Sequence, residues 1–243
     1  MPVVALLTDF GLSDAYVGVM KGVILGRCPS VTLVDISHEV PPQDLVFAAY
    51  QLESAWRWFP EATVFLVVVD PGVGTARRPV AVRVGSRYFV GPDNGVFSLL
   101  PDAEIREIVR PDLPLLSRTF HGRDLFAPVA ADLAAGAPFE ALGPRRSDPV
   151  RLPLRDAEAS IGEVIYLDHY GNAITSLVGR DSGVVEVGGR EVPVRHAYGS
   201  VPVGAVVAVT GSSGRLELSV RNGHAGAALG LERGTPVRWR QDE

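Results

Sequence analysis

Two aspartates follow directly on segments with the composition of buried strands. Residues 3–8 and 63–69 are almost entirely apolar, as strands covered on both faces are, and they end at Asp9 and Asp70. Parallel sheets bind ligands beyond the carboxyl ends of their strands. Asp9 is therefore a candidate to accept hydrogen bonds from the two hydroxyls of a ribose, with capping of the following turn as an equally good interpretation. The turn at residues 71–75 is not a phosphate loop, because it lacks the Gly-Lys-Ser/Thr ending.

Three further polar clusters lie at predicted turns. His121 stands next to Gly122 in a loop ahead of a helical segment, a position that disfavours a core histidine. Residues 168–172 interrupt a strand pattern with polar side chains, for which a simple turn is the competing interpretation. Residues 212–215 and 221–223, each taken singly, are typical of hairpin turns.

The elements that must position these clusters alternate between strands and helices over the first 150 residues. The predicted strands are residues 3–8, 31–36, 63–69, 79–84 and 87–90, the last two joined by a tight turn at Gly85-Ser86. The predicted helices run from a cap at Ser13 to about Arg27, from Pro41-Pro42 to Trp56, and over residues 124–135, with Asp124 as cap or first-turn acid and Pro128 in the first turn. This alternation predicts an α/β domain over residues 1–150, with a mostly parallel sheet flanked by helices.

The pattern changes near residue 150. Residues 145–155 are polar and contain prolines, which indicates a linker. Short strands then follow with almost no helical periodicity, at residues 162–167, 184–187, 191–194, 206–209 and 216–220. Gly188-Gly189 between two of them is a strong hairpin signal. We expect a second domain at residues 151–243, a small antiparallel barrel or sandwich.

Composition narrows the class of protein. The net charge is −5 and the basic residues are scattered, so a nucleic-acid partner is not expected. The longest apolar runs fall far short of the ~20 residues that span a bilayer, and residues 1–9 lack the basic start of a signal peptide. Cys28 is the single cysteine, which suits a reducing compartment. We expect a cytoplasmic protein without a membrane partner.

Taken together, the clusters resemble the S-adenosyl-L-methionine (SAM) hydroxide adenosyltransferases, which are related to the fluorinating and chlorinating enzymes. The resemblance covers essentially the whole chain, in order. It rests on Thr8-Asp9-Phe10-Gly11, Asp14 to Gly18, Lys21-Gly22, Val69 to Gly74 with Arg77, Gly91 to Gly95, Thr119 to Asp124, Asp168 to Asn172 and Arg221-Asn222.

The resemblance implies a fold, an assembly and a set of roles. It implies an α/β domain followed by a β-barrel, and a homotrimer whose active sites lie where one subunit's N-terminal domain meets a neighbour's C-terminal domain. It assigns catalysis to Asp70, Arg77 and His121. It assigns the ribose to Asp9, the methionine end to Asp14, Asp168, Ser212 and Arg215, and the adenine edge to Asn172 and the backbone around Arg221, Asn222 and Gly223. Tyr170 is a candidate to stack on adenine, with burial at a turn as the alternative.

The implied reaction is hydrolysis of SAM to adenosine and L-methionine, and these residue types suit it. A sulfonium leaves as a neutral thioether, so neither a metal nor a cofactor is expected. The poor nucleophilicity of water is the obstacle, and a positioned base typically contributes ~10²–10⁴-fold. Arg77 cannot be that base, because the pKa of a guanidinium stays above ~12. Asp70 and His121 both remain candidates to accept the proton.

Three other functions compete with hydrolysis. Halide enzymes of the family lack the acid at the position of Asp70 and tend to carry serine at that of Gly122, and a carboxylate beside the nucleophile also repels a halide. A non-catalytic SAM or adenosine sensor would have no use for the catalytic set. A metallohydrolase built from Asp9, Asp14, Asp70, His38 and His121 lacks the ligand spacing of known metal motifs. His38 is more simply a turn residue after a strand, and Trp56, Trp58 and Phe59 are packing residues.

Overall fold

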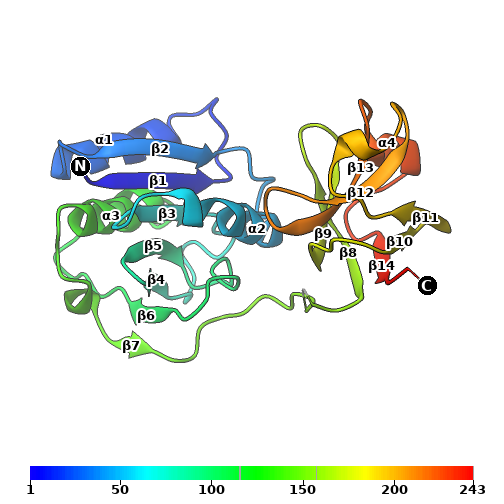
Figure 1. Ribbon diagram of the computed structural model, residues 1–243. Coiled ribbons are helices and arrows are strands. Elements are labelled where there is room, and N and C mark those ends of the chain that lie inside the picture. Colours follow the sequence, from blue (N-terminus) through cyan, green and yellow to red (C-terminus); the bar gives the residue numbers. More distant parts are fainter. Residues whose placement is uncertain (115, 157, 243) are drawn as a thin grey trace. The chain divides into compact units, whose positions relative to one another are not determined.

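The computed structural model describes residues 1–114, 116–156 and 158–242, and it separates at Leu152 into two units (Figure 1). The first unit is Met1–Leu152 and the second is Pro153–Glu243. The separation lies next to the boundary expected at residue 150.

The first unit contains a mixed sheet with its parallel part around β1. The strand order is β2-β1-β3-β5-β4-β6-β7; β2, β1, β3 and β5 are mutually parallel, and β4, β6 and β7 join by antiparallel pairs. The strands are β1 (Val3–Thr8), β2 (Thr32–Ser37), β3 (Val64–Val68), β4 (Pro79–Val84), β5 (Arg87–Pro92), β6 (Glu104–Glu107) and β7 (Arg145–Arg146). The predicted fold class is confirmed.

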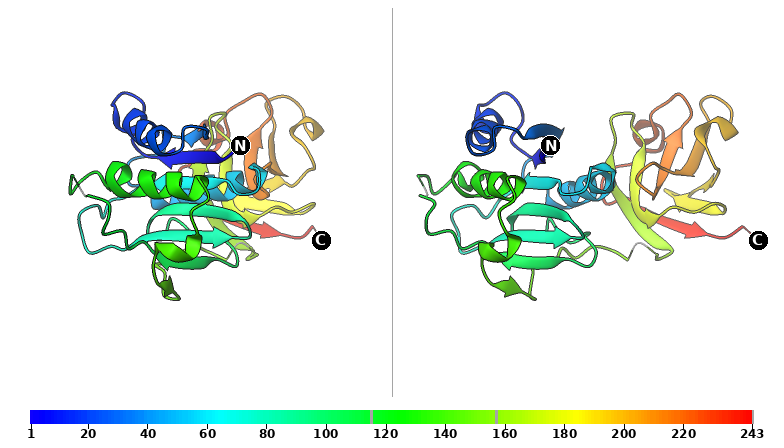
Figure 2. Two further views of the ribbon diagram at one scale, coloured as in Figure 1. Left: turned by 90° about the vertical axis from the view of Figure 1, so that its left-hand side faces the viewer. Right: turned by 60° about the vertical axis from the view of Figure 1, so that its left-hand side comes forward.

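Both faces of this sheet are covered, which explains the continuous apolar runs. Alternate side chains of β1 and β3 enter two separate cores: Val4 and Leu6 pack on one side, and Ala5 and Leu7 on the other. Helices α1 (Tyr16–Arg27) and α3 (Ala127–Ala134) lie side by side against the first core (Figure 2). Helix α2 (Leu45–Ala55) and the short η1 (Trp56–Trp58) pack against the second.

Two helix starts differ from the prediction. Ser13 does not cap α1, which begins at Tyr16 after Ala15 without any side-chain cap. Pro41-Pro42 does not open α2 either; Asp44 does, by accepting a 2.9 Å hydrogen bond from the Phe47 amide. Both helices therefore start later than local sequence indicates.

The chain around the third predicted helix is also more complex than expected. A π-helical turn, η2 (Gly122–Phe126), leads into α3, and the short 3₁₀ helix η3 (Phe139–Leu142) follows. Asp124 lies in the first turn of η2 but caps nothing there; it is buried, paired with Arg123, and accepts from the Ser117 amide. Pro128 falls at the second position of α3, as predicted. The predicted linker contains β7, which pairs with β6.

The second unit is an almost closed antiparallel sheet. Its strand order is β11-β10-β14-β8-β9-β13-β12, and a bridge between Val194 and Ala208 links the two ends of that order. The strands are β8 (Ile161–Leu167), β9 (Ala173–Val178), β10 (Val184–Val187), β11 (Arg190–Pro193), β12 (Val206–Thr210), β13 (Arg215–Val220) and β14 (Pro236–Arg240). A short helix α4 (Ala225–Leu229) and a 3₁₀ turn η4 (Tyr198–Ser200) complete it. The barrel prediction is confirmed.

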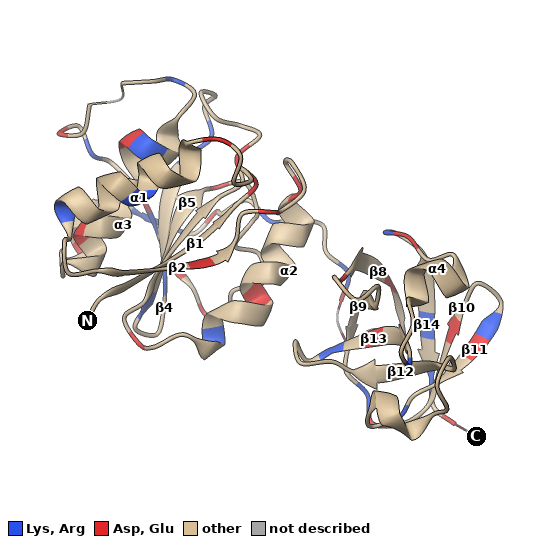
Figure 3. Cartoon of the chain, turned by 90° about the horizontal axis from the view of Figure 1, so that it is seen from above, with Lys and Arg blue, Asp and Glu red and all other residues tan. Residues whose placement is uncertain are grey.

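The hairpins predicted from glycines are present in both units. Gly85-Ser86 joins β4 to β5, and Gly188-Gly189 joins β10 to β11 with φ of +56° and +74°. The sequence did not predict β6, β9, β14 or α4. Basic and acidic side chains are interspersed over each unit (Figure 3). No helix of the described residues is long and apolar enough to span a membrane.

Candidate active site

Asp70, Arg77 and His121 come together in the first unit. Arg77 Nε lies 3.0 Å from each carboxylate oxygen of Asp70, and a terminal guanidinium nitrogen lies 2.5 Å from Oδ2. The same terminal nitrogen lies 2.8 Å from Nδ1 of His121. Arg77 therefore bridges the other two side chains.

A tight turn after β3 brings Arg77 back to Asp70. The Val73 amide donates to the Asp70 carbonyl, and Thr75 donates to the Gly72 carbonyl through both its amide and its hydroxyl. Gly74 is needed here, because its φ is +77° and a Cβ would lie 2.8 Å from the Arg118 carbonyl oxygen. The 70–77 turn thus fixes the Asp–Arg pair through its backbone.

The arginine fixes the protonation of the histidine. A guanidinium only donates hydrogen bonds, so Nδ1 of His121 must accept and the proton of the neutral imidazole sits on Nε2. Burial lowers the pKa of His121, and the positive charge of Arg77 lowers it further. The guanidinium also lies 5.1 Å from the centre of the Phe126 ring, which holds it in place.

A cavity of about 380 Å³ opens beside this group. Asp70 and His121 line it, whereas Arg77 lies behind them with 9% of its side chain exposed. Its other lining residues are Asp9, Phe10, Tyr16, Pro42, Gln43, Val68, Pro71, Val73, Thr119, Phe120 and Gly122. The rings of Phe10, Tyr16 and Phe120 pack together with centroids 5.3–6.2 Å apart; Phe120 meets the other two edge to face, and Phe10 and Tyr16 are tilted against each other.

The two aspartates of the first loop differ in position. Asp9 lines the cavity, and its Oδ2 accepts a 2.8 Å hydrogen bond from the Gln43 amide. Asp14 is exposed and lies outside the lining. Gln43 was not predicted as a site residue. Its φ of +65° is unusual for a residue other than glycine, and nothing in the sequence indicated it.

A second cavity, of about 900 Å³, lies in the second unit. Of the site residues predicted there, Asp168, Tyr170, Asn172, Ser212, Arg221 and Asn222 line it. Arg215 does not; it is buried and donates a 2.8 Å hydrogen bond to the Ser176 carbonyl. Tyr170 is 74% exposed, so the alternative of a buried turn tyrosine is wrong.

Asp168 organises the turn that carries it. Its Oδ1 accepts from the amides of Tyr170 (2.9 Å) and Asn172 (2.8 Å), and its Oδ2 accepts from the Asn172 side-chain amide (2.9 Å). Gly171 is required in this turn, because a Cβ would lie 2.2 Å from the His224 ring. The interpretation of Asp168 as a turn residue is therefore correct. Asp168 also lines the cavity.

The sequence analysis did not identify Tyr198 and Glu217 as site residues of the second unit. Tyr198 and Glu217 both line the cavity, and the Tyr198 hydroxyl donates to the Glu217 carboxylate. Burial raises the pKa of Glu217, and the charge of nearby Asp168 raises it further. The available signal was an acid inside a predicted strand; all residues of β13, in which polar and apolar residues alternate, are buried.

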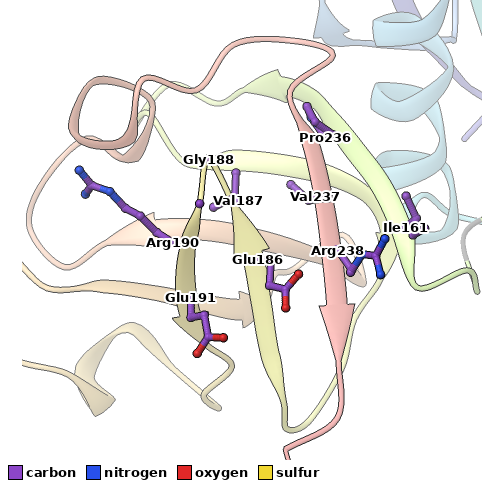
Figure 4. Close-up of a pocket in the computed structure, with 10 residues that line it drawn as sticks. Ile161, Glu186, Val187, Gly188, Arg190, Glu191, Pro236, Val237 and Arg238 are labelled. Atoms are coloured by element: carbon purple, nitrogen blue, oxygen red, sulfur yellow. The ribbon is translucent and has the colours of Figure 1, made fainter.

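A third hollow, of about 370 Å³, lies between the β10–β11 turn and β14 (Figure 4). Its two carboxylates, Glu186 and Glu191, are both paired with Arg240. Each of these carboxylates thus already has an ion-pair partner within the barrel. Elsewhere in the described chain, no three His, Cys, Asp or Glu side chains are arranged to hold a metal ion.

The fold and the site define an α/β domain joined to a β-barrel, with a half-buried Asp–Arg–His group beside a cavity. The chain belongs to the SAM hydroxide adenosyltransferase family. The family's N-terminal domain matches residues 4–143, and its C-terminal domain matches residues 162–238.

Relatives of known name cover nearly the whole chain. An (R)-S-adenosyl-L-methionine hydrolase of Thermus thermophilus is 51% identical over 97% of this chain and 98% of its own. A hydrolase of the same name from Salinispora tropica is 39% identical over 98% and 97%. A fluorinase of Nocardia brasiliensis is more distant, at 30% identity over 90% of each chain. A crystal structure of an uncharacterized conserved protein from Thermotoga maritima superposes with a TM-score of 0.88 at 39% identity, covering 98% of this chain and all of the other.

Proposed function

We propose that this chain hydrolyses S-adenosyl-L-methionine to adenosine and L-methionine. The observation that carries the proposal is Arg77, which bridges Asp70 and His121 beside a cavity that both of them line. The hydrolase names of the more similar relatives support it.

The reaction is a displacement at C5′ of the ribose. A water oxygen forms a bond to C5′ while the C5′–S bond breaks. The electron pair of the broken bond stays on sulfur, which leaves as the neutral thioether of methionine. The water must also lose a proton. Holding the two reactants in line accounts for up to ~7–11 kcal/mol of the barrier in favourable cases.

Asp70 is the proposed acceptor of that proton. Arg77 donates once to Oδ1 and twice to Oδ2, so Oδ1 keeps accepting capacity toward the cavity. His121 is less suited, because its Nδ1 is engaged by Arg77 and its Nε2 already carries a proton. The Nε2–H group donates to the water oxygen and orients it. Arg77 holds the Asp70 carboxylate in place and helps to lower the pKa of His121, which favours the neutral imidazole.

This division of roles predicts a pH dependence. Loss of the neutral imidazole breaks the bond from Arg77, so kcat/KM should be full above the pKa of His121 and fall as the pH drops through it. Because that pKa is lowered by burial and by Arg77, the acid limb should lie below the ordinary histidine value of about 6.5. The check is kcat/KM for SAM against pH, with circular dichroism to confirm folding at the acid end. A midpoint above that value would contradict the assignment.

The substrate contacts are proposed from the cavity walls and from the resemblance. Asp9 takes the ribose hydroxyls, and Asp168 and Ser212 the methionine end. Asn172 and the backbone around Asn222 take the adenine edge, and Tyr170 offers an exposed ring for stacking. The family pattern also places Asp14 and Arg215 at the methionine end, although neither lines a cavity within its own unit.

The assembly is proposed on the same basis. Each unit carries a cavity lined by part of the expected contacts, which suits a homotrimer in which the two parts come from neighbouring subunits. No cofactor takes part, and we propose a cytoplasmic location. Light scattering coupled to size-exclusion chromatography tests the trimer.

Product analysis is the direct test of the function. We expect equimolar adenosine and methionine from SAM, unchanged by added fluoride, chloride or a chelator. A 5′-halo nucleoside would instead place the chain with the halide enzymes, and loss of activity with the chelator would indicate a metal. Binding of SAM without turnover would indicate a sensor.

A further inference from the structure

A buried histidine lies directly behind the loop that carries Asp9. His38 follows β2, is 3% exposed, and has no place in the proposed chemistry. Its Nδ1 lies 2.8 Å from the hydroxyl of Thr8, which is fully buried at the end of β1. Its Nε2 lies 3.0 Å from Asp35 Oδ1, off the line of a good hydrogen bond, so that contact is electrostatic.

The partners of His38 fix the direction of the hydrogen bonds. The Asp35 carboxylate, which also accepts from Lys21 Nζ at 2.7 Å, favours the proton of the imidazole on Nε2. Nδ1 is then an acceptor and the Thr8 hydroxyl must donate to it. The Thr8 oxygen in turn accepts from the Phe10 amide at 3.3 Å.

The same histidine binds the loop through its backbone. The Gly11 amide donates a 2.8 Å hydrogen bond to the His38 carbonyl. Asp9 is therefore held on both sides, by the Thr8 hydroxyl before it and by Gly11 after it. The Gln43 amide holds its carboxylate by donating to Oδ2, and Asp9 lines the cavity.

We propose that His38, acting through Thr8, is a positioning residue that fixes the Asp9 carboxylate for the ribose hydroxyls of the substrate. The proposal rests on the function proposed above. It assigns His38 to recognition of the ribose and leaves the displacement itself to Asp70 and its partners. Hydrogen bonds from residues behind a contacting side chain typically govern how well that side chain is oriented.

The test is discrimination between substrates that differ in one hydroxyl. For each variant, kcat/KM is measured with SAM and with its 3′-deoxyribose analogue, and the ratio of the two reports the contact from Asp9. We expect the ratio to fall roughly tenfold in His38→Ala and in Thr8→Val, the scale of one well-made hydrogen bond. His38→Asn, which keeps an acceptor for the Thr8 hydroxyl, should restore most of the ratio.

Thr63→Val is the matched control. Thr63 is also fully buried, but it precedes β3, and its hydroxyl has no hydrogen-bond partner within the described chain. Its substitution should leave the ratio at the wild-type value. An unchanged ratio in His38→Ala and Thr8→Val, with kcat/KM reduced equally for both substrates, would show a purely structural role and overturn the proposal.

Binding of the product adenosine and of its 3′-deoxy analogue tests this proposal independently of the proposed hydrolysis. The affinities for adenosine and 3′-deoxyadenosine, measured by calorimetry, give the ratio without turnover. Wild-type protein that binds adenosine selectively but does not hydrolyse SAM would refute the hydrolase. The fall of the affinity ratio in Thr8→Val would still decide the role of His38.

Discussion

Replacement of Asp70 by asparagine should lower kcat for SAM hydrolysis by about 10²–10⁴-fold, the usual contribution of a positioned base, with little change in KM. The amide still fills the site and still accepts from Arg77, but it cannot take a proton from water. Steady-state kinetics with product quantification measures both constants. A rise in KM by the same factor as the fall in kcat would mean that Asp70 contacts the substrate itself.

The chain offers a matched control in a second ion pair whose carboxylate is buried. Asp93 is 7% exposed, lies 2.7 Å from a guanidinium nitrogen of Arg78, and accepts from the Val150 amide, but it lines neither of the two cavities that hold the predicted site residues. Both Asp70→Asn and Asp93→Asn remove the charge of a largely buried carboxylate from an ion pair and should lower the melting temperature. Only Asp70→Asn should lower kcat. A comparable loss of kcat in Asp93→Asn would show that disruption of the pair, and not loss of the base, is the cause.

The strands that precede Asp9 and Asp70 were predictable because the sheet is covered on both faces. A strand with two buried faces is apolar at nearly every position, so β1 and β3 stand out as apolar runs that stop where the chain reaches the cavity. The first polar residue after each run is then a site candidate. That physical rule located Asp9 and Asp70.

The helix starts were not predictable, because the site overrides local capping preferences. The Gly11 amide binds the His38 carbonyl and so directs the chain as it leaves β1, and α1 begins only at Tyr16. Similarly, the left-handed backbone of Gln43, whose amide binds Asp9, cannot be part of a helix, and α2 must start after it. Such conflicts between local and global structure are expected at functional sites.

In the barrel, the direction of each side chain determines whether a residue lines the cavity. The pairing of β13 with β9 shifts register between Arg215 and Glu217. A register irregularity re-aims the side chains near it, so Glu217 reaches the cavity while Arg215 turns to Ser176. A short sequence motif identifies a turn, but it does not show on which face of the sheet the side chains next to that turn lie.

Replacement of Arg77 by alanine should lower kcat by about 10²–10³-fold, the range found when one preorganised electrostatic donor is removed, and leave KM little changed. Arg77 lies behind the cavity wall, so the substrate does not lose a contact. What is lost is the set of hydrogen bonds that orients the Asp70 carboxylate and the donor that Nδ1 of His121 accepts from. A large rise in KM would make Arg77 a binding residue instead.

The pH profile of the same variant gives a second, independent readout. The charge of Arg77 helps to lower the pKa of His121, so its removal should raise that pKa and move the acid limb of kcat/KM to higher pH. Arg77→Lys keeps the charge but cannot bridge two partners with a planar fork; it should therefore hold the limb near its wild-type position while kcat stays low. If both variants leave the limb in place, His121 is not the group that titrates, and the role assigned to it is wrong.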